Sequence, residues 1–282
     1  MFAYQSVRLG SWQLPDDRAA VMGIINLTPD SFSDGGEIAG ARALRERIDQ
    51  LVEAGADLLD VGAESTRPGA EAVSADEQLR RLEPLFSQLD RISVPVSLDT
   101  RDARVARVGI EAGVEIVNDV SMGRQDPELA RCVQEAGVVL LLMHSRGTPA
   151  TMDDCADYAS PVEDVVREWN IARKQMGFSA GDSRIWFDPG LGFAKRPEQC
   201  WMLLAAIASG QLPRPAPVTV IGASRKRMTA FGARSADQRD PATHAICAKL
   251  ARPGIVHRVH DVDGAVQAVQ AACRLDGALQ WS

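Results

Sequence analysis

Cysteine is scarce in this sequence of 282 residues, and its placement excludes a disulfide framework or a zinc site built from paired thiols. The cysteines are odd in number, widely spaced and outside any C-x-x-C pattern: Cys132, Cys155, Cys200, Cys247 and Cys273. No uninterrupted apolar stretch approaches the length of a membrane-spanning helix. The start, MFAYQSVRLGSWQLPDD, lacks the basic segment and apolar core of a secretory signal. We therefore expect reduced, mostly structural thiols in a cytoplasmic protein.

An excess of basic residues is missing as well. The chain has 31 Lys and Arg against 38 Asp and Glu, a net charge of −7. Such a balance excludes a broad basic face, so we expect neither nucleic acid nor a membrane as a partner. No G-x-G-x-x-G pattern follows an apolar run, and no stretch rich in proline, glycine or serine divides the chain. We expect one domain over residues 1–282.

The sequence does contain a repeated alternation of apolar runs and helical segments. Eight short runs rich in leucine or β-branched residues begin at Val21, Asp57, Val94, Val114, Val138, Arg184, Pro217 and Gly254. Such runs are typical of parallel strands that are buried on both faces. Several intervening segments end where a helix would stop, at Gly55, Gly113, Gly137 and Gly177. The pattern predicts an α/β fold, a (β/α)8 TIM barrel with residues 1–20 as an accessory N-terminal hairpin, and a doubly wound sheet is the alternative.

Polar side chains follow every apolar run. In a β/α barrel the carboxyl ends of the strands share one face, where the loops build the active site. We therefore expect the following residues to meet there: Asn26, Glu64, Thr66, Arg67, Asp99, Asn118, Asp119, His144, Asp188, Ser224, Arg225, Lys226, Arg227, Arg258 and His260. Structural roles compete for several positions. Thr100 or Asp102 would cap the next helix, Glu64 would be a paired acid, and His144 would be a core histidine.

Two carboxylates favour a ligand over a structural role. Asp99 and Asp188 directly follow apolar runs, so both are expected to lie half-buried. A buried carboxylate stays charged only when donors surround it, and the donor edge of a ligand would supply them.

Two stretches near the end of the sequence predict an anion site. GASRKR, residues 222–227, combines a glycine turn, a hydroxyl and three cations where a helix is expected to begin. HRVHD, residues 257–261, places Arg258 and His260 on one side of the last strand. The loops after strands seven and eight frequently bind phosphate in barrels. The residues alone thus predict a phosphate-bearing small-molecule substrate.

Eight stretches, in a shared order, resemble those of the dihydropteroate synthases: MGIINLTPDSFSDGG, DVGAESTRPGA, VSLDT, IVNDVS, LMH, FDPGLGFAK, GASRK and RVHDV. They extend over nearly the full length, and several exceed the short patterns that match by chance. The resemblance implies a transferase in which para-aminobenzoate displaces diphosphate from 6-hydroxymethyl-7,8-dihydropterin diphosphate, giving 7,8-dihydropteroate for folate biosynthesis. It also implies a β/α barrel, a magnesium ion, a homodimer and inhibition by sulfonamides, which mimic aminobenzoate.

The resemblance assigns roles to the positions that match the family's motifs. The pterin would contact Asp99, Asn118, Met143, Asp188, Phe193, Gly222 and Lys226. The diphosphate would contact Asn26, Thr66, Arg67, Arg258 and His260, with Asn26 also a ligand of Mg²⁺. Aminobenzoate would contact Phe32, Thr66, Pro68, Phe193, Lys226 and Arg227. The catalytic residues would be Asp99, Lys226, Arg258 and His260.

The chemistry favours a dissociative displacement. An aromatic amine is unprotonated at neutral pH, so it needs no base before it attacks. The difficult event is departure of diphosphate, which places negative charge on the leaving group and positive charge on the pterin methylene. Cations and Mg²⁺ would stabilise the first charge, and Asp99 would stabilise the second.

The loop NLTPDSFSDGG, residues 26–36, is interpreted as a substrate-responsive lid. Asn26 would stay fixed at the strand end, while closure would bring Phe32 over the aminobenzoate ring and Asp30 or Asp34 toward the metal. Phe32→Ala should then impair the use of aminobenzoate more than the binding of pterin diphosphate. Equal losses would leave the loop as a structural cover.

Two positions depart from the family pattern. Arg227 stands where many relatives have serine near the aminobenzoate carboxylate, so its guanidinium, or only backbone N–H groups, would bind that carboxylate. Pro253 and His257 are unusual before the last strand, which affects the expected helix packing or dimer surface rather than the active site.

Two other functions compete with this interpretation. A pterin-dependent methyltransferase shares the barrel and the pterin pocket but needs no diphosphate clamp, so STRPG, SRKR and RVHD disfavour it. A non-catalytic pterin-binding paralogue should have lost Asn26, Asp99, Lys226 or His260, and none of them is replaced.

Overall fold

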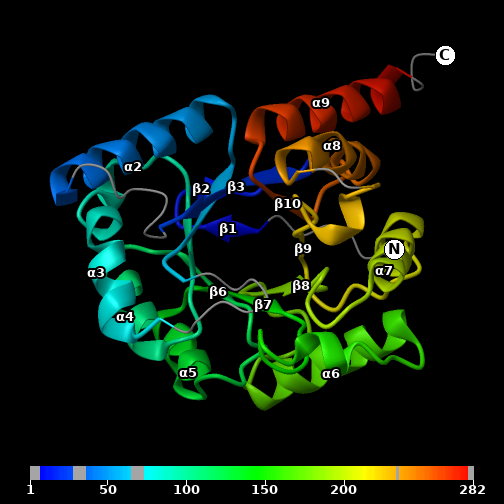
Figure 1. The fold of residues 1–282 in the computed structure, drawn as a ribbon, viewed down its shortest axis with the longest axis horizontal. Coiled ribbons are helices and arrows are strands. Elements are labelled where there is room, and N and C mark those ends of the chain that lie inside the picture. Colours follow the sequence, from blue (N-terminus) through cyan, green and yellow to red (C-terminus); the bar gives the residue numbers. More distant parts are fainter. Residues whose placement is uncertain (1–6, 28–35, 65–72, 233–234, 279–282) are drawn as a thin grey trace.

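The eight predicted strands are present and close into a parallel barrel (Figure 1). The computed structural model describes residues 7–27, 36–64, 73–232 and 235–278. The ring runs in chain order through β3 (Ala20–Asn26), β4 (Leu58–Gly62), β5 (Val96–Asp99), β6 (Ile116–Asp119), β7 (Val139–Met143), β8 (Ile185–Asp188), β9 (Thr219–Ile221) and β10 (Ile255–Val259), which pairs back with β3. A closed ring excludes the doubly wound sheet and confirms the TIM-barrel prediction.

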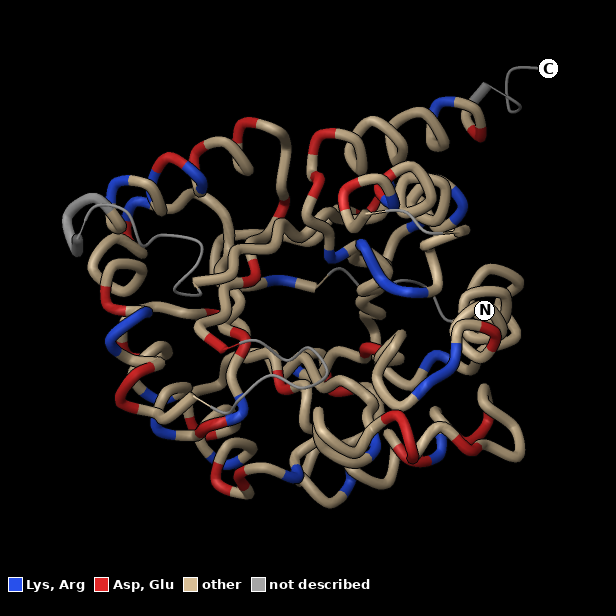
Figure 2. The backbone as a smooth tube through the Cα atoms, viewed as in Figure 1, with Lys and Arg blue, Asp and Glu red and all other residues tan. Residues whose placement is uncertain are grey.

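Helices follow the strands and surround the ring (Figure 1). They are α2 (Gly36–Glu53), α3 (Ala75–Phe86), α4 (Ala103–Ala112), α5 (Glu128–Ala136), α6 (Pro161–Gln175), α7 (Pro197–Ser209), α8 (Asp240–Lys249) and α9 (Val262–Ala278). Short 3₁₀ segments cover Leu89–Arg91, Met152–Cys155, Arg227–Thr229 and Asp237–Arg239. Acidic and basic residues intermingle along these outer helices (Figure 2). Among the described helices, none is both long and apolar enough to cross a membrane.

Local sequence signals set the ends of these helices. Asp102 caps α4 by accepting hydrogen bonds from the backbone N–H groups of Arg104 and Val105, as one of the two predicted caps. Gly113 and Gly137 end α4 and α5 in the left-handed conformation, which costs glycine little. The glycine punctuation before the strands is therefore confirmed.

The core lies mainly between the barrel and its helices, because alternate strand residues point outward. Trp169 of α6 is fully buried, stacks edge-on against Phe187 of β8, and donates from Nε1 to the Leu142 carbonyl at 2.8 Å. Inward-pointing residues of several strands form a second apolar cluster inside the ring, which includes Met22, Leu141 and other strand residues. Burying one such side chain contributes roughly 1.5–3 kcal/mol to stability.

The predicted accessory hairpin closes the amino-terminal end of the barrel. Its strands, β1 (Arg8–Leu9) and β2 (Trp12–Gln13), pair antiparallel. Val7, Leu9 and Leu14 are buried and join the cluster inside the ring, against residues near the strand starts. Because this end of the barrel is covered by apolar side chains, we expect the polar site at the carboxyl-terminal end.

Candidate active site

The carboxyl ends of neighbouring strands bring the predicted polar residues to one level. Across β3 to β6, Asn26 pairs with Gly62, Gly62 with Asp99, and Asp99 with Asn118. Across β7 and β8, a second pairing sets Met143 beside Asp188. Residues two apart on a strand share a face, and the residues two before Asn118, Met143 and Asp188 belong to the cluster inside the ring. The side chains of Asn118, Met143 and Asp188 therefore face the barrel interior.

Asp60 of β4 is a site residue that the sequence interpretation missed. Its side chain is fully buried and accepts hydrogen bonds from Ser97 Oγ at 2.5 Å and Arg258 Nε at 2.5 Å. It also accepts from Asn118 Nδ2 at 3.2 and 3.3 Å. The signal was available, because an acid inside an otherwise apolar strand must find donors. Asp60 lies one inward-facing position below the level of Gly62, so it supports the mouth from beneath.

Asn118 presents an acceptor to the barrel interior. Its Oδ1 is buried and has no hydrogen-bond partner in the part of the chain that the structure describes. Because Asp60 accepts from the amide nitrogen, the orientation of the amide is set and the oxygen is left to another donor. Buried polar atoms are nearly always hydrogen-bonded, so this atom indicates where a ligand N–H would bind.

Asp99 lies beside Arg258, whose Nη2 donates to its Oδ2 at 3.2 Å. Burial, followed by the negative charge of Asp60, raises the pKa of Asp99 to about 7, although Arg258 opposes this shift. A carboxyl group with a pKa near neutrality becomes fully charged when a cation or a donor arrives. Asp99 is therefore suited to respond to positive charge that develops on a bound ligand.

Asp188 is oriented by the turn that follows it. Its Oδ1 accepts from the backbone N–H of Gly190 at 2.7 Å, and burial raises its pKa above the ordinary value. A Cβ added at Gly222 would lie 3.7 Å from Asp188 Oδ2, so the bare glycine borders this carboxylate. The predicted pair of Asp188 and Gly222 is thus adjacent inside the barrel.

The three consecutive cations of GASRKR diverge, which corrects the prediction of a joint anion site. Only Lys226 turns toward the site, donating to the Leu191 carbonyl at 2.8 Å and lying 4.2 Å from the centroid of the Phe193 ring. Arg225 binds Asp240 through two hydrogen bonds. The side chain of Arg227 is 82% exposed.

The expected helix start after Ser224 is also wrong. Among the described residues, the 3₁₀ segments Arg227–Thr229 and Asp237–Arg239 follow, and α8 begins at Asp240. The positive φ of 59° at Arg225 turns the backbone and separates the side chains on either side of it. Burial lowers the pKa of Lys226 to about 8, so this lysine is a cation near neutral pH.

His260 and Ser224 join the ends of β10 and β9. Ser224 Oγ lies 2.9 Å from His260 Nδ1 and also accepts from the His260 backbone N–H at 3.2 Å. Arg258, two positions earlier on the same face of β10, points inward to Asp60 and Asp99. The two residues expected to share one side of the strand therefore contact different partners.

Several predicted residues have structural partners or fall outside the described residues. Glu64 is paired with Arg101 at 2.7 Å, as the structural alternative proposed. Asp119 accepts from the backbone N–H groups of Ser121 and Gly123 and so closes a turn. Outside the described residues lie Asp30, Phe32, Asp34, Thr66, Arg67 and Pro68.

Comparison with known proteins identifies the family. Residues 22–260 match the family described as pterin binding enzyme. The dihydropteroate synthase of Synechocystis sp. is 37% identical over 264 residues, which covers 90% of this chain and 89% of that protein. The solved dihydropteroate synthase of Xanthomonas albilineans with 4-aminobenzoic acid is 34% identical with a TM-score of 0.84, covering 96% of this chain and 98% of that chain. The Yersinia pestis enzyme in complex with a sulfonamide drug is 29% identical with a TM-score of 0.84, covering 97% and 100%. This chain therefore belongs to the pterin binding enzyme family.

Proposed function

We propose that this protein is a dihydropteroate synthase, which joins para-aminobenzoate to 6-hydroxymethyl-7,8-dihydropterin diphosphate and releases diphosphate in folate biosynthesis. Relatives of that name match it over nearly their full length. The structural observation that carries the proposal is the buried Oδ1 of Asn118, which has no partner among the described residues and belongs to a strand between those of Asp99 and Asp188. A pterin edge carries N–H groups that complement such a set of acceptors.

The pterin would lie inside the barrel against Met143 and Phe193, with its N–H groups directed to Asn118 and Asp188. Met143 is buried at the end of β7, and its register partner is Asp188. Donors on the ligand would favour the charged form of Asp188, whose pKa burial raises. Lys226 and Gly222 would complete the recognition of the ring.

The diphosphate would bind closer to the opening, near Asn26, Arg258 and His260. The Asn26 side chain is exposed at the end of β3, so its amide oxygen fits a hard cation that keeps waters and phosphate oxygens as its other ligands. No group of three or more His, Cys, Asp or Glu side chains suited to a metal occurs among the described residues. Asn26 is the proposed protein ligand of Mg²⁺, which when bound would neutralise charge on the diphosphate.

The proposed reaction breaks the bond between the pterin methylene carbon and the diphosphate oxygen. The electron pair leaves with diphosphate, the aminobenzoate nitrogen then forms the new C–N bond, and the amine loses a proton. Asp99 lies inside the barrel with a pKa raised to about 7, and a nearby cation would draw it into the charged form. Arg258 and Lys226 would stabilise the departing charge, and one such group typically contributes about 10²- to 10³-fold in rate.

Aminobenzoate would enter above the pterin, beside Phe193 and Lys226. Phe32, Thr66 and Pro68 are proposed contacts from the two connecting loops, while Arg227 would contribute its backbone because its side chain points to solvent near Asp153. Sulfonamides would compete for this position.

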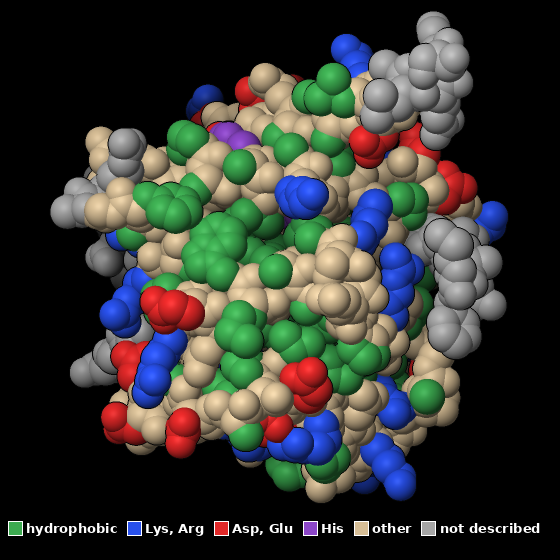
Figure 3. All heavy atoms as spheres, turned by 90° about the vertical axis from the view of Figure 1, so that its right-hand side faces the viewer, with side chains coloured by type: hydrophobic (Ala, Val, Ile, Leu, Met, Phe, Trp, Pro, Cys, Tyr) green, Lys and Arg blue, Asp and Glu red, His purple; other side chains and the backbone are tan. Residues whose placement is uncertain are grey.

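A cytoplasmic homodimer is the proposed assembly, and an apolar face supports it (Figure 3). Hydrophobic side chains gather on this side of the molecule. The rings of Trp201 in α7 and Phe231 contact each other at a tilt, with centroids 5.9 Å apart. Phe231 is 67% exposed, and Met202 is 49% exposed. Apolar clusters this exposed commonly mark interfaces.

Diphosphate release tests the proposal. The protein is incubated with the pterin diphosphate and Mg²⁺, with and without aminobenzoate, and both diphosphate and dihydropteroate are measured. We expect release that depends on aminobenzoate and is blocked by a sulfonamide. Pterin binding without release would indicate the non-catalytic paralogue, and methyl transfer to or from a pterin would indicate the methyltransferase.

A further inference from the structure

Lys195, in the loop between β8 and α7, is a buried lysine with an unusual set of partners. Its side chain reaches four acceptors: His144 Nδ1 at 2.9 Å, Phe193 O at 3.0 Å, Gly190 O at 3.2 Å and His144 O at 3.4 Å. The residue is only 8% exposed. None of these acceptors is a carboxylate, so the ammonium is held by neutral oxygen and nitrogen atoms. Burial accordingly lowers its pKa to about 7.

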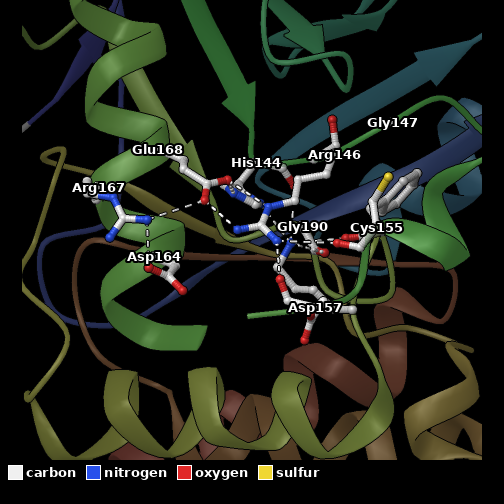
Figure 4. A network of polar contacts seen from close by, with 12 residues as sticks. His144, Arg146, Gly147, Cys155, Asp157, Asp164, Arg167, Glu168 and Gly190 are labelled. Carbon is white, nitrogen blue, oxygen red and sulfur yellow. Dashed lines mark hydrogen bonds and ion pairs between the residues drawn. The ribbon is translucent and has the colours of Figure 1, made fainter. Parts of the chain in front are cut away.

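His144 is held in one orientation beneath this lysine. Its ring is fully buried, and Nε2 lies 3.2 Å from Glu168 Oε2, while Figure 4 shows Glu168 also reaching Arg146. Burial, followed by the charge of Lys195, lowers the pKa of His144 to about 3, so the ring is neutral. A neutral ring that donates from Nε2 to Glu168 keeps Nδ1 as the acceptor for Lys195.

Residues 190–194 form a tight turn whose carbonyls contact both Lys195 and Lys226. We refer to it as the 190–194 turn. Gly190 has a φ of 66°, and a Cβ there would come within 1.8 Å of the His144 carbonyl oxygen. The turn gives the carbonyls of Gly190 and Phe193 to Lys195. It gives the carbonyl of Leu191, which lies between them in sequence, to Lys226 at 2.8 Å. Two ammonium groups therefore bind one short turn.

We propose that Lys195 is a positioning residue, whose ammonium, oriented by His144, fixes the 190–194 turn and thereby places Lys226 and the Phe193 ring for the substrates. The inference rests on the proposed function, in which Lys226 and Phe193 contact pterin and aminobenzoate. The chain has four lysines, and the other two, Lys174 and Lys249, are exposed.

A double-mutant cycle separates positioning from a contribution to stability alone. Lys195→Met, Lys226→Met, the double variant and the exposed control Lys174→Met are compared for kcat/KM and for the midpoint of thermal unfolding. Because displacement by about 1 Å costs up to roughly 10²-fold, we expect Lys195→Met to lower kcat/KM by about 10- to 100-fold. The double variant should lose less than the product of the two single losses, because the part of the effect that acts through Lys226 is already removed while the displacement of Phe193 remains. Losses that multiply, or no loss from Lys195→Met, would overturn the inference.

A pair of histidine variants provides the second test if Lys195→Met does not fold. An asparagine amide reaches the position of Nδ1 and can accept from Lys195, whereas a glutamine amide reaches that of Nε2 and can contact only Glu168. We expect His144→Gln to lower kcat/KM by about 10- to 100-fold and His144→Asn to lose less than about threefold. Equal losses, or the reverse order, would overturn the inference.

Binding of 6-hydroxymethylpterin, measured by calorimetry on the same variants, needs no turnover. It therefore distinguishes the two possible failures. If the wild-type protein binds the pterin but releases no diphosphate, the proposed function fails while the cycle between Lys195 and Lys226 can still be completed on affinity. We expect Lys195→Met and Lys226→Met to be non-additive in affinity as well, and additive effects would contradict the positioning role.

Discussion

Asp60 accepts hydrogen bonds from the amide nitrogen of Asn118 at 3.2 and 3.3 Å, and this contact turns the amide oxygen toward the barrel interior. The same carboxylate also binds Arg258, so one buried acid orients both an acceptor and a cation. Removing one partner of a buried network leaves the others unsatisfied, which costs more than one hydrogen bond contributes.

Asp60→Asn should therefore weaken pterin binding. The neutral amide leaves Arg258 without its closest carboxylate. Because one of its two polar atoms is a donor, it also no longer fixes the orientation of the Asn118 amide. We expect the Kd for 6-hydroxymethylpterin to rise by about 10- to 100-fold, which corresponds to about 1.4–2.8 kcal/mol. Ser97→Ala, which removes another bond to Asp60 but leaves Asn118 and Arg258 paired, is the matched control, with an expected change below about threefold. A similar loss in both variants would show that Asp60 acts through general stability.

Arg227→Ser should have little effect on aminobenzoate. The guanidinium is 82% exposed and lies 3.9 Å from Asp153, so it is screened by solvent. We expect KM for aminobenzoate to change by less than about threefold, whereas Lys226→Met should raise it strongly. An increase above tenfold in the serine variant would show that the Arg227 side chain turns inward when substrate binds.

Stability in acid should depend on His257, which is buried and donates from Nε2 to the Leu250 carbonyl at 3.2 Å. Burial lowers its pKa to about 4 from an ordinary value near 6.5, so between these pH values the unfolded chain binds more protons. The free energy of unfolding should accordingly fall as the pH drops from 6.5 to 4, by up to about 3 kcal/mol from this residue.

His257→Gln keeps a donor for Leu250 but does not titrate. Denaturant unfolding at pH 7 and pH 4.5 should show a smaller difference in the variant than in the wild type. The buried His144, with a pKa lowered to about 3, contributes with the same sign in both proteins and cancels in the comparison. Identical pH dependence in both proteins would contradict a buried neutral His257.

If the protein forms the proposed homodimer, Phe231→Glu should shift it toward the monomer. Phe231 is 67% exposed beside Trp201 on the apolar face, and a charge there would be buried without a partner in an interface. Leu275 of α9 is 69% exposed and lies in another element of the fold, so Leu275→Glu is the matched control. Light scattering over a concentration series should show dissociation only in the first variant. Dissociation in both, or in neither, would place the interface elsewhere.

The barrel could be predicted from the sequence because its signals are local. Buried apolar runs and the glycines that end helices, such as Gly113 and Gly137, depend on residues close in the chain. The alignment of Asp99, Asn118 and Asp188 followed from the fold, since carboxyl ends of parallel strands share one face.

Other features depend on partners that are distant in sequence. Arg225 turns away from Lys226 because Asp240 binds it, and nothing within GASRKR reveals that pairing. Asp60 lies within an apolar strand, and the sequence does not reveal its role because its partners Asn118 and Arg258 lie 58 and 198 positions further on. Periodicity places a side chain on a face but does not identify what it meets there.

The hairpin packs Val7, Leu9 and Leu14 against residues near the amino ends of the strands, so among the described residues apolar side chains cover this end of the barrel. In the proposed function the pterin binds at the level of Asn118, below the aminobenzoate position, so the pterin would enter before aminobenzoate from the carboxyl-terminal end. Diphosphate would leave through that same end, and the joined product would have to dissociate through it before the next pterin could bind. The proposed order of binding would therefore depend on the covered amino-terminal end of the barrel as well as on the residues at its carboxyl-terminal end.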